Sequence, residues 1–340
     1  MYGGIANNSG VNECPQKQPI DNSYTSNHPY IHTSLFGFLN IYKPVGMTSH
    51  DVVAVLRRIT KIKQIGHTGT LDPFAQGVLP VCIGKATRLI EFLSEEKEYL
   101  ATVQFGSATT TYDIEGEKTF TSDKKITQQE AENGLKFFEG EISQLPPIYS
   151  AIKVKGKKLY EYARKGENVE IAPRKVVIEK IELKSFDSEL QQAQILIKCS
   201  KGTYIRSIAH DLGQNLGVGA HLIKLIRTQS GKFRIENSNK LDGIDVAQNL
   251  VNPLEILDLP KIDVSEEDLA KIRNGICPQF LQFKPNFSTK SNEILRVAQN
   301  DEKEETYISK FQNDNFFILV YNHCEICAIA QGNKLKKVFL

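Results

Sequence analysis

Asp72 lies in a segment whose composition favours a functional site, GHTGTLDPFAQGVLPVCIGKAT from Gly66 to Thr87. The part up to Gly77 shows neither the helical nor the strand period, so it predicts a shaped loop. The proline after Asp72 disfavours helical backbone there, and the apolar run Val78 to Ile83 predicts a buried strand. An isolated Asp-Pro is more often a turn aspartate that binds nearby backbone. The glycine and threonine content and His67 favour a site, although they do not specify a reaction.

A second group of chemically suitable residues is the basic segment Lys153 to Lys165, which holds six basic residues and one acid. Tyr160 and Tyr162 stand among the basic residues. Basic side chains reach phosphates and aromatic rings stack on bases, so the segment is a candidate RNA contact. Its alternative interpretation is a solvated charged face.

Alternation and apolar spacing predict the elements that would position these residues. Gly37 to Tyr42 is expected to form a strand, and Ser49 is expected to cap the helix after it. Lys97 to Gly106 alternates as a half-buried strand that carries Tyr99 on its apolar face. A helix is predicted from Tyr204 to Leu216, where a glycine follows. Ala220 to Arg227 is predicted as another short helix.

The bulk composition sets wider limits on function. At 340 residues the chain is long enough for two domains, and its net charge of +2 is too small to indicate nucleic acid by itself. No apolar run approaches the ~20 residues of a membrane span, and no signal peptide is predicted, so a cytoplasmic protein is expected. Cys324 and Cys327 fall in expected strands, where residues three apart point to opposite faces. They are interpreted as strand cysteines, and no metal site is predicted.

Five stretches, in order, resemble the bacterial tRNA pseudouridine-55 synthases, the TruB family. They are FLNIYKPVGMTSHD, GHTGTLDPFAQGVLP, KEYLATVQFG, YSAIKVKGKKLYEYARKG and CSKGTYIRSIAHDLG, and they cover most of residues 36–227. Five ordered motifs are far more specific than one. The resemblance implies an isomerase that converts a uridine in the T arm of tRNA, at position 55, to pseudouridine by base flipping.

The fold implied by the resemblance is α+β, a mixed and mainly antiparallel sheet flanked by helices and loops. The catalytic domain would span residues 36–250, with a thumb-like RNA-binding insertion at about 146–172. A small PUA-like β-barrel would follow at 254–340 and carry a polar insertion at about 286–310. Residues 1–35 are polar and without an apolar period, which predicts a disordered extension.

The resemblance also implies roles for individual residues. Asp72 would act at the sugar as nucleophile or base, with Arg206 as its partner and Tyr99 against the flipped base. His67 would stack in the place that the base leaves, while Tyr204 and Leu225 would line the pocket. The RNA would be held by the thumb lysines Lys155, Lys157 and Lys158. An arginine beside Asp72 would lower its pKa, and Asp113 would support the site.

The reaction has no net redox step or phosphate donor, so no cofactor is expected. A monomer that binds the T stem-loop is the expected form. Two alternatives remain open. One is an RNA-binding or tRNA-folding protein without chemistry, and the other is a guide-RNA-dependent relative of the family.

Overall fold

The structure is a computed structural model, and it describes residues 35–167, 169–278, 294–296, 316–321, 325–331 and 334–340. The predicted N-terminal extension lies outside the described residues up to residue 34. Most of the predicted polar insertion at 286–310 lies outside them as well, as does Cys324. None of the described helices is long and apolar enough to cross a membrane.

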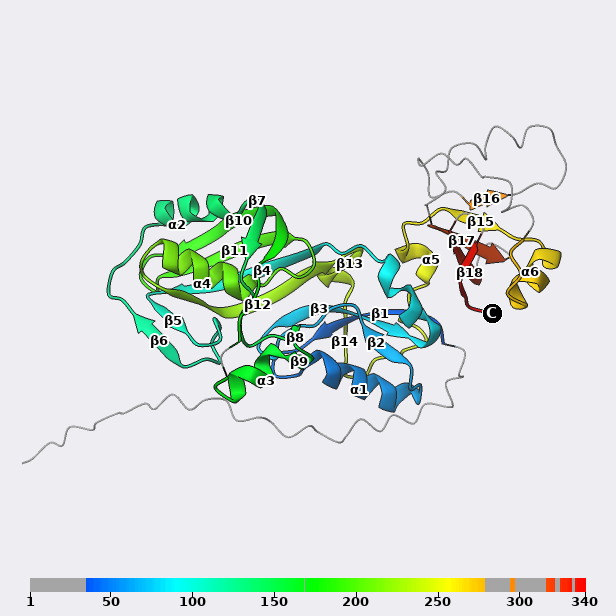
Figure 1. Ribbon diagram of the computed structural model, residues 1–340, viewed down its shortest axis with the longest axis horizontal. Coiled ribbons are helices and arrows are strands. Elements are labelled where there is room, and N and C mark those ends of the chain that lie inside the picture. The colour runs from blue at the N-terminus through cyan, green and yellow to red at the C-terminus, as the bar shows by residue number, and fades with distance from the viewer. Residues whose placement is uncertain (1–34, 168, 279–293, 297–315, 322–324, 332–333) are drawn as a thin grey trace, which may run out of the picture.

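A large, mainly antiparallel sheet forms the centre of the described chain (Figure 1). Its main path is β14-β1-β3-β12-β4-β11-β10-β7, with β13 paired to β12 and β2 paired to β3. Only the pairs β1–β14 and β3–β12 are parallel within this sheet. The strands are β1 (Gly37–Lys43), β2 (Ile65–His67), β3 (Gln76–Ile83), β4 (Lys97–Phe105), β7 (Gly140–Gln144), β10 (Arg174–Asp187), β11 (Gln192–Cys199), β12 (Ala220–Ser230), β13 (Phe233–Arg234) and β14 (Asn239–Lys240). The predicted α+β class with a mainly antiparallel sheet is confirmed.

Helices and short elements cover the sheet, and their bounds follow the local sequence. The helices are α1 (Ser49–Thr60), α2 (Gln128–Leu135), α3 (Leu159–Arg164), α4 (Ile205–Asn215), α5 (Pro253–Ile256) and α6 (Glu266–Arg273), with 3-10 turns η1 (Gly84–Phe92), η2 (Lys136–Phe138) and η3 (Ile235–Asn237). Two small hairpins complete this part, β5 (Ser107–Thr109) with β6 (Lys118–Thr121), and β8 (Lys153–Val154) with β9 (Lys157–Lys158). The cap of α1 is Thr48 rather than Ser49, because Thr48 and Asp51 form a capping box.

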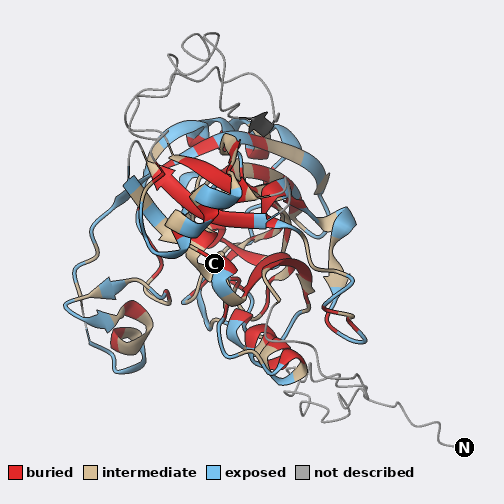
Figure 2. Cartoon of the chain, turned by 90° about the vertical axis from the view of Figure 1, so that its right-hand side faces the viewer, coloured by how far each residue is buried: buried red, intermediate tan, exposed pale blue. Residues whose placement is uncertain are grey.

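The strand β4 shows the predicted alternation, since every second residue from Lys97 to Phe105 is buried. Figure 2 shows that buried residues concentrate in the sheet and on the inner sides of the helices. The apolar residues of β4 pack with α2 and α4 into one core cluster. A charged residue, Lys97, therefore occupies the first position of a face that otherwise belongs to the core.

The prediction of a helix over Ala220 to Arg227 was wrong, because this segment is the strand β12 in the middle of the sheet. Its pairing with β4 shifts register between Leu222 and Lys224 and again between Arg227 and Gln229. Such irregularities interrupt the period of two, so that apolar residues fall at helical spacing in a strand. Leu225 therefore lies on β12, opposite Ala101 of β4.

The C-terminal residues form a second sheet of order β16-β15-β17-β18-β19. Its strands are β15 (Lys261–Asp263), β16 (Ile294–Arg296), β17 (Phe316–Tyr321), β18 (Glu325–Gln331) and β19 (Lys334–Val338). Within the described ranges this path does not close, so the predicted PUA-like barrel is not seen as a closed barrel. One core cluster joins the two sheets, because Phe38 and Leu89 pack with Ile318, Val320 and Phe339.

Gly77 lies where β3 approaches β12 closely, just after the loop that carries Asp72. Its φ is +105°, and a Cβ there would lie 2.3 Å from the carbonyl oxygen of Arg227. Gly140 has φ +85° with open space around it, so it is a matched control. We expect Gly140→Ala to lower the free energy of unfolding by about 1–2 kcal/mol through its backbone conformation alone.

Gly77→Ala is expected to cost about 3 kcal/mol or more, since the clash adds to the same backbone penalty. Urea denaturation of both variants measures the difference. Equal losses would show that β3 can move away from β12 without cost.

Candidate active site

The loop that carries Asp72 joins β2 to β3 and is fixed at several points along its length. The Leu71 amide donates to Ser49 Oγ of α1 at 2.8 Å, and the Thr68 amide donates to the Pro80 carbonyl at 3.1 Å. Lys43 is fully buried, and its ammonium donates to the carbonyls of Met47 at 2.6 Å and Pro73 at 3.3 Å. Hence the stiff loop predicted from the sequence is held by backbone and side-chain bonds on both sides of Asp72.

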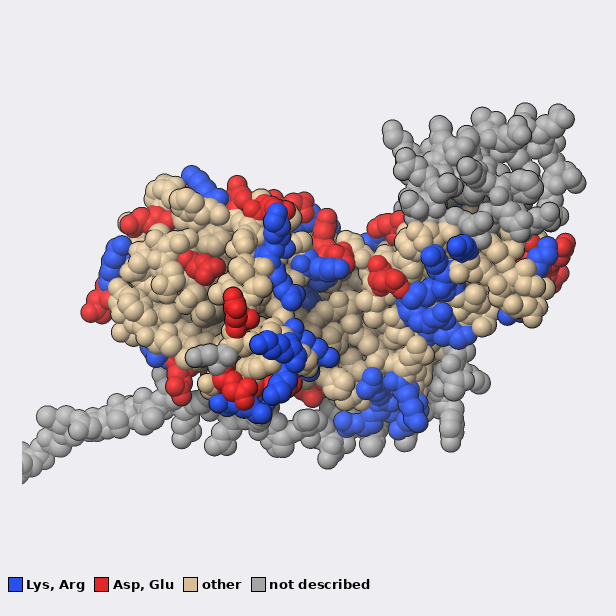
Figure 3. Space-filling view, viewed as in Figure 1, with Lys and Arg blue, Asp and Glu red and all other residues tan. Residues whose placement is uncertain are grey.

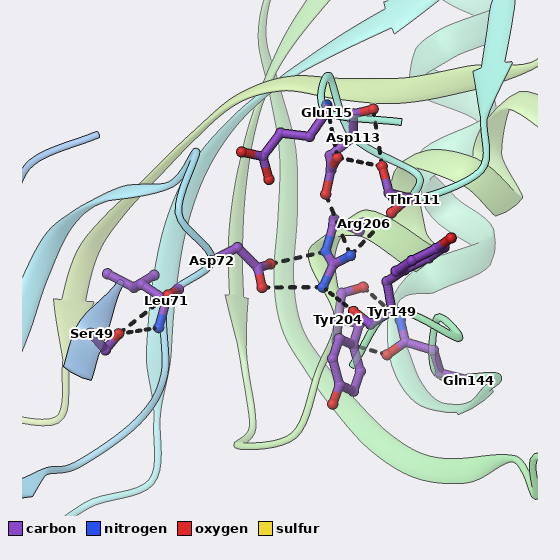
Figure 4. Close-up of polar contacts among 10 residues, drawn as sticks. All are labelled: Ser49, Leu71, Asp72, Thr111, Asp113, Glu115, Gln144, Tyr149, Tyr204 and Arg206. Carbon is purple, nitrogen blue, oxygen red and sulfur yellow. Dashed lines mark hydrogen bonds and ion pairs between the residues drawn. The ribbon is translucent and has the colours of Figure 1, made fainter. Parts of the chain in front are cut away.

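The Asp72 carboxylate meets the guanidinium of Arg206 edge to edge (Figure 4). Arg206 Nε lies 2.9 Å from Asp72 Oδ2, and Nη2 donates to Oδ1 at 3.2 Å. Two parallel contacts of this kind fix orientation as well as charge. Arg206 is 5% exposed whereas Asp72 is 35% exposed, so the carboxylate faces the cavity and the arginine stands behind it.

The remaining donors of Arg206 hold the guanidinium in place. Nη1 donates to the Thr111 carbonyl at 3.1 Å and lies 3.4 Å from Asp113 Oδ2, while Nη2 donates to the Tyr149 carbonyl at 3.0 Å. Asp113 is itself oriented by the Thr111 hydroxyl and by the Glu115 amide. Asp113 thus sits beside Arg206, on the segment between β5 and β6, and Tyr149 lies at the start of the thumb-like segment.

The pKa of Asp72 departs from the expectation of the sequence. Burial raises it above the ordinary aspartate value of 3.8 and Asp113 raises it further, while Arg206 acts in the opposite direction. Arg206 thus lowers the pKa as expected, but desolvation of the carboxylate outweighs the ion pair, so the net shift is upward.

A cavity of about 640 Å³ opens beside Asp72, and it brings together five of the predicted residues. These are Asp72, Tyr99, Tyr204, Arg206 and Leu225. Tyr99 comes from β4 and is almost fully buried, which raises the pKa of its phenol. Tyr204 precedes α4, and its backbone exchanges two hydrogen bonds with the Gln144 side chain, at 2.8 and 3.0 Å. The cavity is therefore built from the central strands, the Asp72 loop and the first turn of α4.

His67 does not line this cavity. It ends β2, half-buried, and its Nδ1 has no hydrogen-bond partner among the described residues. Burial, with the neighbouring Arg227 and His50, lowers the pKa of the imidazole. A neutral ring with a free nitrogen is compatible with stacking on RNA, but the structure leaves its role as a prediction.

The three thumb lysines lie away from the cavity, on and beside the hairpin β8–β9. Lys155 (φ +50°) and Gly156 (φ +85°) form its two-residue turn, as a primed turn requires. Lys157 Nζ lies 5.7 Å from the ring centre of Tyr162, and Lys158 Nζ lies 5.3 Å from that of Tyr160. Figure 3 shows Lys and Arg side chains gathered where Figure 1 draws β8, β9 and α3.

Several cations of the cavity were not among the predicted site residues, and two of them, Lys97 and Arg227, are buried. Lys97 could have been found, since a lysine on the core face of an alternating strand needs an explanation. Arg227 could not, because the wrong helix prediction left its orientation undefined. The bonds to the Thr111 and Tyr149 carbonyls had no sequence signal at all.

Two family models match adjacent parts of the chain. The N-terminal domain of the TruB family pseudouridylate synthases matches residues 57–205, and the C-terminal domain of tRNA pseudouridylate synthase B matches residues 206–255. Several bacterial relatives bear the name tRNA pseudouridine synthase B. That of Clostridium tetani is 43% identical over 78% of this chain and 92% of its own length. That of Staphylococcus haemolyticus is 49% identical over 70% of this chain and 84% of its own length.

A solved structure agrees with the fold. The crystal structure of a Cbf5–Nop10–Gar1 complex matches with a TM-score of 0.62 and 25% identity, over 90% of this chain and 85% of the other. The identity and coverage of the bacterial relatives, together with the two family models, establish the relationship. The chain belongs to the TruB family of pseudouridylate synthases.

Proposed function

We propose that this chain isomerises a uridine of tRNA to pseudouridine, at position 55 in the T arm, in the cytoplasm and as a monomer. The observation that carries the proposal is the carboxylate of Asp72, which Arg206 fixes in two contacts at the wall of a cavity of about 640 Å³. The names of the bacterial relatives support tRNA as the substrate. No cofactor is needed, because the reaction rearranges one nucleoside.

Asp72 is suited to act at C1′ of the flipped uridine. Arg206 holds one edge of the carboxylate, and the exposed remainder faces the cavity where the sugar would lie. A glycoside hydrolase would normally place a second carboxylate across the sugar. The other acids that line this cavity, Glu91 and Glu95, are instead paired with Lys337 and Lys201. The arrangement therefore favours isomerisation over hydrolysis.

The other predicted residues are suited to binding the RNA and to holding the extruded uridine during that reaction. Tyr99 of β4 and Leu225 of β12 lie two positions apart in register on neighbouring strands, and both line the cavity, where they would contact the extruded base. Extrusion costs a few kcal/mol, and stacking of His67 in the vacated place would return ~1–3 kcal/mol. The thumb would bind phosphates, and Tyr149 would connect it to Arg206 through the carbonyl contact at 3.0 Å.

The two alternatives are less well supported. A protein that only binds RNA has no use for a partly desolvated carboxylate, since such a group repels phosphates. A guide-dependent enzyme is disfavoured by identity, which is 43–49% to bacterial relatives but 25% to Cbf5. The segment after Pro147, which includes the β8–β9 hairpin and α3, also supports the standalone type.

Asp72→Asn tests the chemical role directly. We expect no detectable pseudouridine in a T-arm stem-loop, because an amide is neither nucleophile nor base, whereas RNA affinity should stay within a few-fold. Nucleoside digests and a binding titration measure the two quantities. The control is Asp123→Asn, an exposed position outside the cavity. Measurable turnover by a pure Asp72→Asn preparation would refute the assignment.

The pH dependence should follow the raised pKa of Asp72. Protonation inactivates the carboxylate, so the single-turnover rate should fall as pH decreases through a value above 3.8. Asp113 contributes to the raised pKa, and Asp113→Asn should therefore move this acid limb to lower pH. Rates measured from pH 4 to 8, with protein stability checked at each pH, test the direction. An acid limb that moves to higher pH would contradict it.

The thumb lysines should determine affinity rather than rate. Replacing Lys155, Lys157 and Lys158 with Ala should reduce the slope of log affinity against log salt by about 2 to 3. Turnover at saturating RNA should fall much less. A matched control removes Lys175, Lys180 and Lys184, which are exposed on β10 and already paired with glutamates. A salt slope that is the same for both triple variants would show that the thumb lysines do not contact phosphate.

A further inference from the structure

Lys97 presents an unneutralised charge to the cavity. It stands two residues before Tyr99 on the buried face of β4 and is only 9% exposed. It lines the cavity, and the described residues offer its ammonium neither an ion pair nor a hydrogen bond, although Glu95 attracts it from farther away. Lys97 Nζ is not among the buried polar atoms that lack a partner, so the ammonium reaches the open cavity, where a ligand can contact it.

Arg227 stands beside Lys97 and is fixed more firmly. It is 1% exposed, and it pairs with Tyr99 across the β12–β4 ladder. Arg227 Nε donates to the Val78 carbonyl at 2.6 Å, and Nη2 donates to the Gly69 carbonyl at 3.1 Å. Neutral carbonyls orient this guanidinium without cancelling its charge.

Gly69 shows how close the two cations are to one corner of the cavity. A Cβ on Gly69 would lie 3.6 Å from Arg227 Nη1 and 3.7 Å from Lys97 Cε. Both side chains therefore reach the same wall of the Asp72 loop. Burial, and then the charge of Arg227, lower the pKa of Lys97 to about 8.

Three of the other cations that line the cavity are paired with acids in the described structure, Arg206 with Asp72, Lys201 with Glu95 and Lys337 with Glu91. Arg88 of η1 also lines the cavity without an ion pair among the described residues, but it is turned to the C-terminal segment, where it donates to the Val338 carbonyl at 2.7 Å and lies over the Phe339 ring. The corner formed by Lys97 and Arg227 is thus a positively charged part of the cavity wall beside Tyr99. A buried positive corner attracts an anion, or a group that becomes anionic during the reaction.

The proposed isomerisation creates such a group, and the inference rests on that proposal. When the N1–C1′ bond breaks, both electrons leave with the base, which becomes a uracil anion with charge on N1 and on the carbonyl oxygens. C1′ becomes electron-poor, at the side of the cavity where Asp72 lies. After the base turns, C5 supplies the electrons of the new bond to C1′, the C5 proton passes to solvent water, and N1 takes up a proton from solvent water, so that no net proton is gained or lost. The charges that appear in the first step thereby disappear in the last.

We propose that Lys97, oriented beside Arg227, contacts the oxygen edge of the detached uracil and stabilises its negative charge. A base held against Tyr99 lies next to Lys97, because the two residues are neighbours on one face of β4. The cavity then places a charge of opposite sign beside each reaction centre. The Asp72 carboxylate lies beside the electron-poor sugar, and the cations of Lys97 and Arg227 lie beside the anionic base.

The test compares two leaving groups in single-turnover reactions of Lys97→Met. One stem-loop carries uridine at the target position and the other carries 5-fluorouridine, whose fluorine already stabilises the base anion. Loss of the starting nucleoside is followed by chromatography of digests. We expect Lys97→Met to slow the uridine reaction about 100-fold, as loss of one charge-stabilising group does elsewhere. The same substitution should slow the 5-fluorouridine reaction only about tenfold.

Lys97→Arg keeps the charge and should recover most of the uridine rate. The rate of the Lys97→Arg variant should also begin to fall at a higher pH than the rate of the wild-type protein. The reason is that a guanidinium stays protonated at pH values where an amine with a pKa of about 8 does not. The charged or titratable groups that act on Lys97 are Arg227, Cys199, Glu95 and Lys201, and both variants retain all of them.

Three results would overturn the inference. Equal slowing with both leaving groups would mean that Lys97 only supports the fold, which melting temperatures would show independently. A weakened affinity with a flatter salt dependence and an unchanged rate would place a backbone phosphate at Lys97. Full activity of the Lys97→Met variant would show that Lys97 has no role in the reaction. Failure of the wild-type protein to convert uridine would instead refute the proposed function, so the two failures are distinguishable.

Discussion

The contact between Arg206 and Asp72 is the constraint on which the site depends. One guanidinium from the first turn of α4 meets the Asp72 loop, the Thr111–Asp113 segment and the start of the thumb-like segment at Tyr149. These segments are separated along the chain by the central strands. Arg206 is almost fully buried, so the protein must supply the groups that stabilise its charge: Nη1 and Nη2 donate hydrogen bonds, while Nε contacts Asp72 Oδ2 as an ion pair. The need to surround one buried side chain thereby fixes the relative positions of three segments at the cavity.

This arrangement has an energetic cost that the fold must offset. Two carboxylates and one guanidinium are taken from water, and the pKa of Asp72 rises because the ion pair does not fully compensate its desolvation. The offset comes from the surrounding core, in which β4, β11, α2 and α4 bury a large continuous cluster. Rigid support of this kind holds the Asp72 carboxylate in one orientation.

Local sequence patterns allowed prediction of much of the fold, and their failures have identifiable physical causes. Strict alternation located β4 and its buried face, and the helix predicted from Tyr204 to Leu216 agrees with α4 to within one residue at each end. The register shifts of β12 removed the alternation on which strand prediction relies, and a helix was predicted instead. The pairing of Asp72 with Arg206 spans residues far apart in sequence and followed only from the family resemblance. The direction in which the pKa of Asp72 is shifted could not be predicted, because the shift depends on how deeply the folded chain buries the carboxylate.

The C-terminal sheet contributes to the wall of the cavity. Lys337 of β19 lines the cavity and pairs with Glu91 of η1. Arg88 of η1 donates to the Val338 carbonyl and lies 5.2 Å from the centre of the Phe339 ring, while Lys85 donates to the carbonyls of Phe339 and Leu340. Since η1 also supplies Thr87 and Ile90 to the cavity, β19 and η1 together form one side of it. The shape of the cavity therefore depends on how the C-terminal sheet packs on η1 as well as on the central sheet.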